Sequence, residues 1–314
     1  MHGVLVVDKP QGPTSHDVVR WVRRALRTRA VGHAGTLDPM ATGVLVVAAG
    51  EATKLVRWLT ADDKAYRATL RLGAETDTLD AEGEVVEEAP VPPLDLALVR
   101  AAVARFVGTH PQRPPLYSAI RVDGVRMHER ARRGEDFEVP TRDVTAHRIE
   151  VLRAEGDELE LELECSKGYY VRSLGRDLAR ALETRGHLTS LRRVRSGAFD
   201  LDGAVTAEEL ERAARDDDAH HAMVGRLRSL VDACGAMPQV VLDAEGVVDA
   251  RHGRRVRAAE LPEEGVEPVA MLDAAGELIA VGRSEHDHLR VLRGIVAPPR
   301  RETPNESSHE PGED

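Results

Sequence analysis

The first quarter of the chain places short apolar runs on either side of an amphipathic stretch. Residues 3–7, Gly-Val-Leu-Val-Val, and residues 44–49, Val-Leu-Val-Val-Ala-Ala, have the length of buried strands. Between them, Thr14 and Asp17 have the spacing of a helix capping box. We therefore expect a strand, a helix with a basic outer face and a second strand. The apolar face of this helix consists of Val18, Val22, Ala25 and Leu26.

Further along, alternation of apolar and polar residues predicts two half-buried strands. One contains the alternation of residues 66–72 and the other that of residues 159–165. Each has an apolar residue at every second position, which is the pattern of a strand with one buried face. The remaining periodicity predicts helices over residues 51–59, 94–107 and 174–182, and further strands over residues 84–87 and 145–153.

The pattern changes near Pro238. Short apolar alternations separated by glycines follow, which is typical of a small β-barrel-like module. Residues 298–314 are rich in Pro, Glu and Ser without periodicity and are predicted to be disordered. We divide the chain into a large domain (1–235), a small β-rich domain (236–297) and a tail (298–314).

Composition places the 314-residue chain among ordinary globular proteins, with 42% hydrophobic residues. No apolar run approaches the roughly 18 residues of a membrane span, and the N-terminus lacks the basic start of a secretory signal. We therefore expect a cytoplasmic protein without membrane contact. Cys165 and Cys234 lie far apart without ligand-spaced neighbours, so neither a disulfide framework nor a metal site is indicated.

The net charge of −11 at first argues against a nucleic-acid partner, but its distribution reverses that impression. Residues 1–58 hold 8 Lys and Arg against 4 Asp and Glu, and residues 165–197 hold 8 against 2. Residues 112–133 are also basic, with 6 against 2. Segregated basic stretches can form a basic face, although solvated helix surfaces explain such runs equally well.

The most distinctive polar residues lie on the loop before the apolar run 44–49. Glycines and Pro39 shape this loop, and Pro39 keeps Asp38 out of the α region. Taken alone, these residues also fit an ordinary Asp-Pro turn. Their order is more specific, because residues 32–39, Gly-His-Ala-Gly-Thr-Leu-Asp-Pro, closely resemble the catalytic motif of the TruB family of tRNA pseudouridine synthases. In that family the Asp is catalytic.

Other segments resemble the same family in the same order. The further matches are residues 8–10 (Asp-Lys-Pro), 64–67 (Lys-Ala-Tyr-Arg), 112–121, 166–173 (Ser-Lys-Gly-Tyr-Tyr-Val-Arg-Ser) and 188–193. Two positions depart from the usual pattern: Tyr169 is an additional tyrosine, and His128 stands where an aromatic residue is common. The segment after residue 236 is similar, less specifically, to the family's RNA-binding PUA domain.

This resemblance implies both a fold and a function. The fold is α+β, a pseudouridine synthase fold with a mixed, mostly antiparallel central sheet flanked by helices, followed by a β-rich PUA-like domain. The function is isomerisation of uridine to pseudouridine at position 55 in the T loop of tRNA, on a flipped-out nucleotide. The partner is the T arm of tRNA; neither a metal nor another cofactor is needed, and we expect a monomer.

The resemblance also implies roles for individual residues. Asp38 is the catalytic carboxylate, Arg172 its cationic partner and Tyr66 the ring that stacks on the target base. An adjacent guanidinium suits Arg172 to its role, because a buried carboxylate needs compensation. The expected substrate-binding residues are His33, Lys9, Tyr170, Leu191 and Thr36. The basic segments, and not the resemblance alone, give the expected RNA-backbone contacts, which are Arg20, Arg24, Arg121, Arg192 and Arg193.

Three other classes of function stay open at this point. A non-catalytic tRNA-binding or tRNA-folding protein would need the basic faces without Asp38. A glycosidase would need a second carboxylate opposite Asp38, and the matched motifs offer no convincing one. A purely structural protein would leave the ordered motifs unexplained.

Overall fold

The computed structural model describes residues 1–118, 120–122, 125–133, 135, 137–235 and 237–295. The chain forms two compact units, Met1–Ala236 and Met237–Asp314. Each unit has its own hydrophobic core. The predicted tail, residues 298–314, lies outside the described residues.

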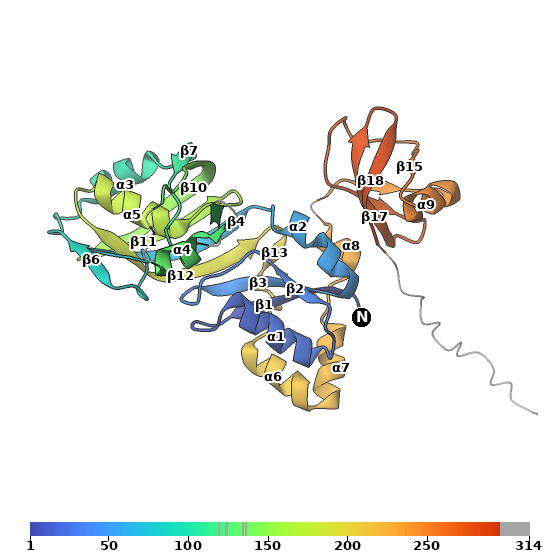
Figure 1. Ribbon diagram of the computed structural model, residues 1–314, viewed down its shortest axis with the longest axis horizontal. Helices are drawn as coiled ribbons and strands as arrows, with labels where there is room; N and C mark the ends of the chain where they lie inside the picture. Colours follow the sequence, from blue (N-terminus) through green and yellow to red (C-terminus); the bar gives the residue numbers. More distant parts are fainter. Residues whose placement is uncertain (119, 123–124, 134, 136, 236, 296–314) are drawn as a thin grey trace, which may run out of the picture. The chain divides into compact units, whose positions relative to one another are not determined.

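The first unit contains a nine-stranded sheet, counted over the described residues (Figure 1). The central order is β1-β3-β12-β4-β11-β10-β7, with β2 beside β3 and β13 beside β12. All pairs are antiparallel except β3 with β12, so the sheet is mixed and mostly antiparallel, as the resemblance implied. The strands are β1 (Gly3–Lys9), β2 (Val31–Ala34), β3 (Thr42–Ala49), β4 (Lys64–Leu72), β7 (Gly108–Gln112), β10 (Arg142–Glu155), β11 (Glu158–Cys165), β12 (Gly186–Ser196) and β13 (Phe199–Asp200).

Strand burial follows the sequence pattern. β3 is buried along almost its whole length, as its unbroken apolar run predicts for a strand covered on both faces. β4 and β11 alternate, with one face in the core and Arg67, Arg71 and Glu162 on the other. The two strands pair directly, with Tyr66 opposite Leu163.

Helices cover the sheet in two groups (Figure 1). One group contains α1 (Ser15–Ala25), α6 (Ala207–Arg215) and α7 (Asp217–Gly225), and the other contains α3 (Leu96–Ala104) and α5 (Val171–Ala181). Thr14 and Asp17 form the predicted capping box of α1. The remaining elements of this unit are a 3₁₀ helix (Gly50–Leu55), α2 (Val56–Leu59), α4 (Met127–Arg132), α8 (Leu230–Ala233) and two small hairpins, β5 (Ala74–Thr76) with β6 (Val85–Glu88) and β8 (Arg121–Val122) with β9 (Val125–Arg126).

The second unit is β-rich, as predicted. Its five-stranded sheet has the order β14-β16-β17-β18-β15 in the described residues, and one helix packs on it. The elements are β14 (Gln239–Val241), α9 (Ala244–Arg251), β15 (Arg255–Val256), β16 (Val269–Leu272), β17 (Leu278–Glu285) and β18 (His288–Gly294). In neither unit is a described helix long and apolar enough to cross a membrane.

Several predicted boundaries differ from the structure. The helix predicted over residues 51–59 is a 3₁₀ helix followed by one α-helical turn. The helix predicted over residues 94–107 is shorter, because Asp95 caps its start and the backbone turns after Ala104. α5 begins at Val171, three residues earlier than predicted, so Arg172 lies in its first turn.

Gly43 fixes the point where β3 meets β12. Its φ is +97°, and a Cβ there would lie 2.2 Å from the carbonyl oxygen of Arg193. Only glycine fits, because both the left-handed backbone and the close approach of β12 exclude a side chain. The loop that carries Asp38 enters β3 at this point.

We expect Gly43→Ala to lower the free energy of unfolding by about 3 kcal/mol, because β12 must move or the backbone must strain. Gly32→Ala is the matched control, since nothing lies within 4 Å of a Cβ at Gly32. Its effect should stay within about 0.5 kcal/mol. Urea unfolding of both variants measures the difference, and equal effects would contradict the packing argument.

Candidate functional site

The loop that carries Asp38 is held by side chains from distant elements. The hydroxyl of Ser15, at the start of α1, donates to the carbonyl of Leu37 at 3.0 Å and accepts from its N–H at 2.9 Å. Arg193 on β12 donates from Nη2 to the Gly35 carbonyl at 3.1 Å. These bonds satisfy backbone groups that the irregular loop cannot pair by itself.

Lys9, at the end of β1, also holds the backbone of this loop. It is fully buried, and its Nζ donates to the carbonyls of Pro10, Pro39 and Ala41 at 3.0, 3.1 and 2.6 Å. Burial lowers the pKa of Lys9 to about 8, and the charge of Asp38 opposes that fall. The sequence predicted substrate contact for Lys9; the structure places it under the loop instead of in the cavity wall.

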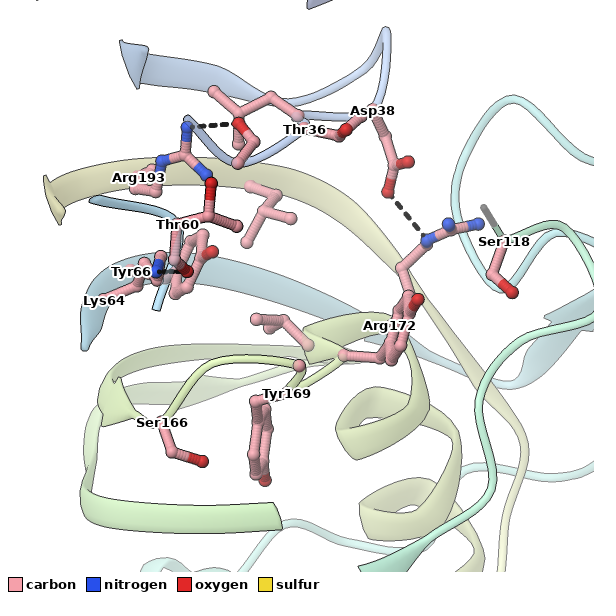
Figure 2. A pocket seen from close by; sticks show the side chains of 16 residues that line it. Thr36, Asp38, Thr60, Lys64, Tyr66, Ser118, Ser166, Tyr169, Arg172 and Arg193 are labelled. Carbon is pink, nitrogen blue, oxygen red and sulfur yellow. Dashed lines mark hydrogen bonds and ion pairs between the residues drawn. The ribbon is translucent and has the colours of Figure 1, made fainter. Parts of the chain in front are cut away.

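Arg172 joins two carboxylates. Its Nε lies 3.0 Å from Oδ2 of Asp38, and its Nη1 lies 3.3 Å from Oδ2 of Asp80. The guanidinium also donates to the carbonyls of Thr78 and Tyr117 at 2.8 and 3.0 Å. Figure 2 shows Asp38 reaching from its loop towards Arg172. The predicted partnership of Asp38 and Arg172 is therefore present, through one nitrogen instead of a bidentate fork.

The two carboxylates differ in exposure. The Asp38 side chain is 36% exposed, whereas that of Asp80 is 4% exposed and accepts hydrogen bonds from the Thr78 hydroxyl and the Glu82 N–H. Desolvation raises the pKa of the Asp38 carboxyl above its ordinary value; Arg172 opposes that rise and Asp80 adds to it. Asp38 is the carboxylate available to a ligand, and Asp80 holds the arginine.

A cavity of about 300 Å³ opens in front of Asp38. This is the size of pocket that takes a single small ligand. Seven residues predicted for the site line it: Thr36, Asp38, Tyr66, Tyr170, Arg172, Leu191 and Arg193. They come from the Asp38 loop, β4, β12 and the start of α5, so elements distant in sequence build one site.

Tyr66 lies on the side of this cavity away from Arg172, together with Lys64 and Arg193 (Figure 2). Burial raises the pKa of the Tyr66 hydroxyl, which keeps the phenol neutral. Lys64 donates from Nζ to the carbonyls of Thr60, at 2.7 Å, and Asp62. Burial lowers its pKa to about 8. The cavity thus has an anionic side at Asp38 and an aromatic side at Tyr66.

Comparison with known proteins gives the family. Residues 23–171 match the N-terminal domain model of the TruB family pseudouridylate synthases, and residues 172–247 match that of the tRNA pseudouridylate synthase B C-terminal domain. A tRNA pseudouridine synthase B from Cupriavidus pinatubonensis is 42% identical over 301 residues, 93% of this chain and 94% of the relative. The chain belongs to the TruB family. It is thus a pseudouridine synthase, an isomerase that converts uridine to pseudouridine.

Other relatives agree with this membership. A tRNA pseudouridine synthase B from Corynebacterium diphtheriae is 50% identical over 218 residues, 67% of this chain and 72% of the relative. A crystal structure of a Cbf5-Nop10-Gar1 complex contains a chain with a TM-score of 0.75 and 26% identity, covering 94% of this chain and 85% of that one. The fold implied by the sequence motifs is thereby confirmed.

Some residues expected to contact the substrate or the RNA backbone lie outside the cavity of this TruB chain. His33 on β2 packs edge-to-face against His16, with ring centroids 5.3 Å apart, and burial lowers its pKa from 6.5. Arg20 and Arg24 are exposed on α1, and Arg20 pairs with Asp17. The side chain of Arg121 lies outside the described residues.

Arg192 and Arg193 on β12 were both expected to contact the RNA backbone, but their surroundings differ. Arg192 is partly exposed and binds Asp8 at 2.8 Å. Arg193 is only 1% exposed, because its guanidinium is used on the carbonyls of Gly35 and Val44. An arginine in that position supports the loop and the cavity wall instead of an RNA strand at the surface.

The motifs did not identify all the residues of this TruB site. Ser15 lies in the predicted capping box and Lys64 in a matched segment, but no local pattern indicates the partners that the structure gives them. Asp80, which none of the matched segments includes, forms an ion pair with Arg172. Among the described residues, no group of three or more His, Cys, Asp or Glu is placed to hold a metal ion.

We expect Arg172→Gln to lower the free energy of unfolding by about 3–5 kcal/mol, because two carboxylates lose their cation. Adding Asp80→Asn should recover much of this loss, since Asp80 is the more buried of the two. Adding Asp38→Asn should recover less, because Asp38 can be solvated through the cavity. Urea unfolding of the single and double variants measures the recoveries, and a larger recovery with Asp38→Asn would contradict the assignment.

Proposed function

We propose that this TruB-family protein isomerises uridine to pseudouridine at position 55 in the T loop of tRNA, with Asp38 as the catalytic residue. The reaction breaks the bond from ribose C1′ to uracil N1 and forms a bond from C1′ to C5. N1 gains a proton, and the C5 hydrogen is released to solvent. The chemistry is internal to one nucleotide and needs no second substrate.

One observation carries the role of Asp38: it is the single acidic residue among the described residues that line the cavity. An ionised carboxylate can act as a nucleophile or accept a proton, and both are useful at the reacting nucleotide. Asp80 is too buried to serve as a second carboxylate. This arrangement favours a one-carboxylate reaction over a glycosidase, which uses two.

The cavity fits one base that has left its stack. A uridine inside a folded T loop must be flipped out before Asp38 can reach its sugar, at a cost of a few kcal/mol. Tyr66 replaces the lost stacking with its ring, and Leu191 adds an apolar contact. Tyr170 and Thr36 complete the contacts to the nucleotide. This division of roles is supported by the positions of these side chains in the cavity lining.

The remaining contacts lie outside the cavity. His33 is half-buried on the strand that leads into the Asp38 loop, so it meets the part of the T loop that the uridine has left. Arg20, Arg24, Arg121 and Arg192 bind phosphates, which position the arm without reading its sequence. The second unit is a PUA-like RNA-binding domain, and its exposed Arg251, Arg255 and Arg257 are suited to phosphate contact.

We expect Asp38→Asn to abolish tritium release from tRNA labelled at uridine C5, because the amide can neither attack nor accept a proton. The free energy of unfolding should not fall, because the raised pKa of Asp38 means that its ionised form destabilises the folded state. This cost is absent below pH 3.8, where the carboxyl is protonated in both states, and it is fully present above the folded-state pKa. Thermal unfolding and tRNA binding of the same variant are the controls.

The wild-type result decides between the open alternatives. Tritium release with the new pseudouridine mapped to position 55 supports the proposal. Tight tRNA binding without any tritium release would favour a tRNA-folding protein instead. Release at the wild-type rate by Asp38→Asn would remove the catalytic assignment.

The pH dependence of single-turnover rates tests the electrostatics. Asp38 must be ionised, so the rate should fall as the pH drops through its raised pKa. Asp80→Asn removes a charge that raises this pKa, so the acid limb should move to lower pH. Asp95→Asn is the matched control, because Asp95 is an exposed helix cap and Asn caps equally well. An acid limb that stays in place with Asp80→Asn would contradict the coupling.

A further inference from the structure

A second cavity, of about 420 Å³, adjoins the one in front of Asp38. The two cavities share Thr60, Gly168 and Tyr170 in their linings. The second cavity differs in chemistry, since it is lined by Arg57, Arg142 and Lys167 and by one carboxylate, Asp143. Its charged side chains therefore sum to a positive charge beside the site of the reacting nucleotide.

Two of these cations are available to a ligand. Arg142 on β10 and Lys167 on the loop between β11 and α5 are both exposed, and neither forms an ion pair with a described residue. Most other arginines of this sheet are occupied: Arg148 and Arg153, also on β10, pair with glutamates. Arg142 and Lys167 thus differ from the arginines farther along the sheet, which are paired with carboxylates.

The walls of this cavity are held in place by hydrogen bonds. Gln112, the register partner of Arg142, binds the backbone of Tyr170 with both ends of its amide, at 2.9 and 3.1 Å. Ser166, next to Lys167, is bound to the backbone of Thr145 on β10 from both its N–H and its hydroxyl. The segments that carry the two cations are therefore fixed relative to Tyr170.

Gly168 leaves the shared rim open. Its φ is +80°, and no atom lies within 4 Å of the position that a Cβ would take. Backbone without a side chain allows a ligand strand to approach closely. A nucleotide in the first cavity remains joined to the RNA by two phosphates, and at least one of them must pass the rim of that cavity.

We propose that the second cavity is a phosphate subsite, in which Arg142 and Lys167 bind one of the two phosphates that flank the target uridine. The inference rests on the proposed function, because it takes the uridine in the first cavity as given. Charge-assisted bonds from Arg and Lys are the usual recognition of a phosphodiester. The subsite fixes the strand beside the flipped nucleotide and adds affinity without reading sequence.

The test combines protein and RNA changes in one cycle. A T-arm hairpin is made with the natural phosphate, or with a neutral methylphosphonate on the 5′ or the 3′ side of the target uridine. The full-length wild type, Arg142→Gln with Lys167→Gln, and Arg100→Gln are compared by tritium release and by hairpin binding. Arg100 is the matched control, since it is exposed, unpaired among the described residues and absent from both cavity linings.

We expect the double variant to lose about tenfold in kcat/KM on the natural hairpin, and wild type to lose about as much with one of the two neutral linkages. With that linkage the double variant should lose nothing further, because the interaction is already absent. Arg100→Gln should behave as wild type. Its binding slope against salt should stay unchanged, whereas that of the double variant should fall by about 1 for each phosphate that the variant no longer binds.

Two results would overturn the subsite. One is a double variant that matches wild type on the natural hairpin. The other is that each neutral linkage, tested separately, lowers kcat/KM by the same factor in wild type and in the double variant. Neither flanking phosphate would then contact these cations. A wild type that binds the hairpin without releasing tritium would instead defeat the proposed function, and the same cycle measured as Kd would still decide the subsite.

Discussion

The ion pair of Arg172 with Asp38 and Asp80 is the constraint on which the site depends. The arginine is 4% exposed and lies in the first turn of α5, so its charge is stable there only with partners close by. Two carboxylates and two carbonyls supply them, and they come from three separate segments. The pair therefore brings together the Asp38 loop, the turn before Asp80 and the segment containing Tyr117. These segments stay together because removal of the arginine would leave Asp80 buried without a cation and Asp38 without its ion pair.

The loop that carries Asp38 lacks regular backbone hydrogen bonding and is likewise held by side chains from other segments. Lys9, Ser15 and Arg193 bind its backbone carbonyls, whereas the side chain of Asp38 extends to the cavity and to Arg172. The loop backbone is held by side chains from elsewhere, so its own side chains are free of that task. Asp38 can then keep a raised pKa and partial exposure, a combination that costs folding energy, without the loop giving way. Preorganisation of a reactive group is achieved by such surrounding contacts more than by the group itself.

The sequence predicted the strands and helices of this fold better than it predicted which charged side chains are buried. The alternation around Tyr66 and Leu163, the capping box at Thr14 and the pairing of Asp38 with Arg172 were all found where expected. Lys9 was assigned to substrate and Arg193 to RNA because both lie in segments that match the family, yet both side chains are buried. Their burial depends on carbonyls of the Asp38 loop: Pro39, 30 residues beyond Lys9, and Gly35, 158 residues before Arg193. No periodicity or local motif reports such partners, and the same limit applies to Ser15 and Lys64.

The negative net charge of the chain is partly balanced by local ion pairs on the sheet. Arg67 and Arg148 both bind Glu162 across neighbouring strands, and Arg153 binds Glu160, so these arginines neutralise the acidic residues of β11. Part of the chain's excess of acidic residues is thus paired with arginines of the same chain, on one exposed face of its sheet. A cation without a local carboxylate can bind a phosphate without first giving up a partner, and this criterion adds to what its place in a basic run indicates. Arg142 and Lys167 meet this criterion beside the cavity, whereas Arg192, in the most basic segment of the chain, is already bound to Asp8.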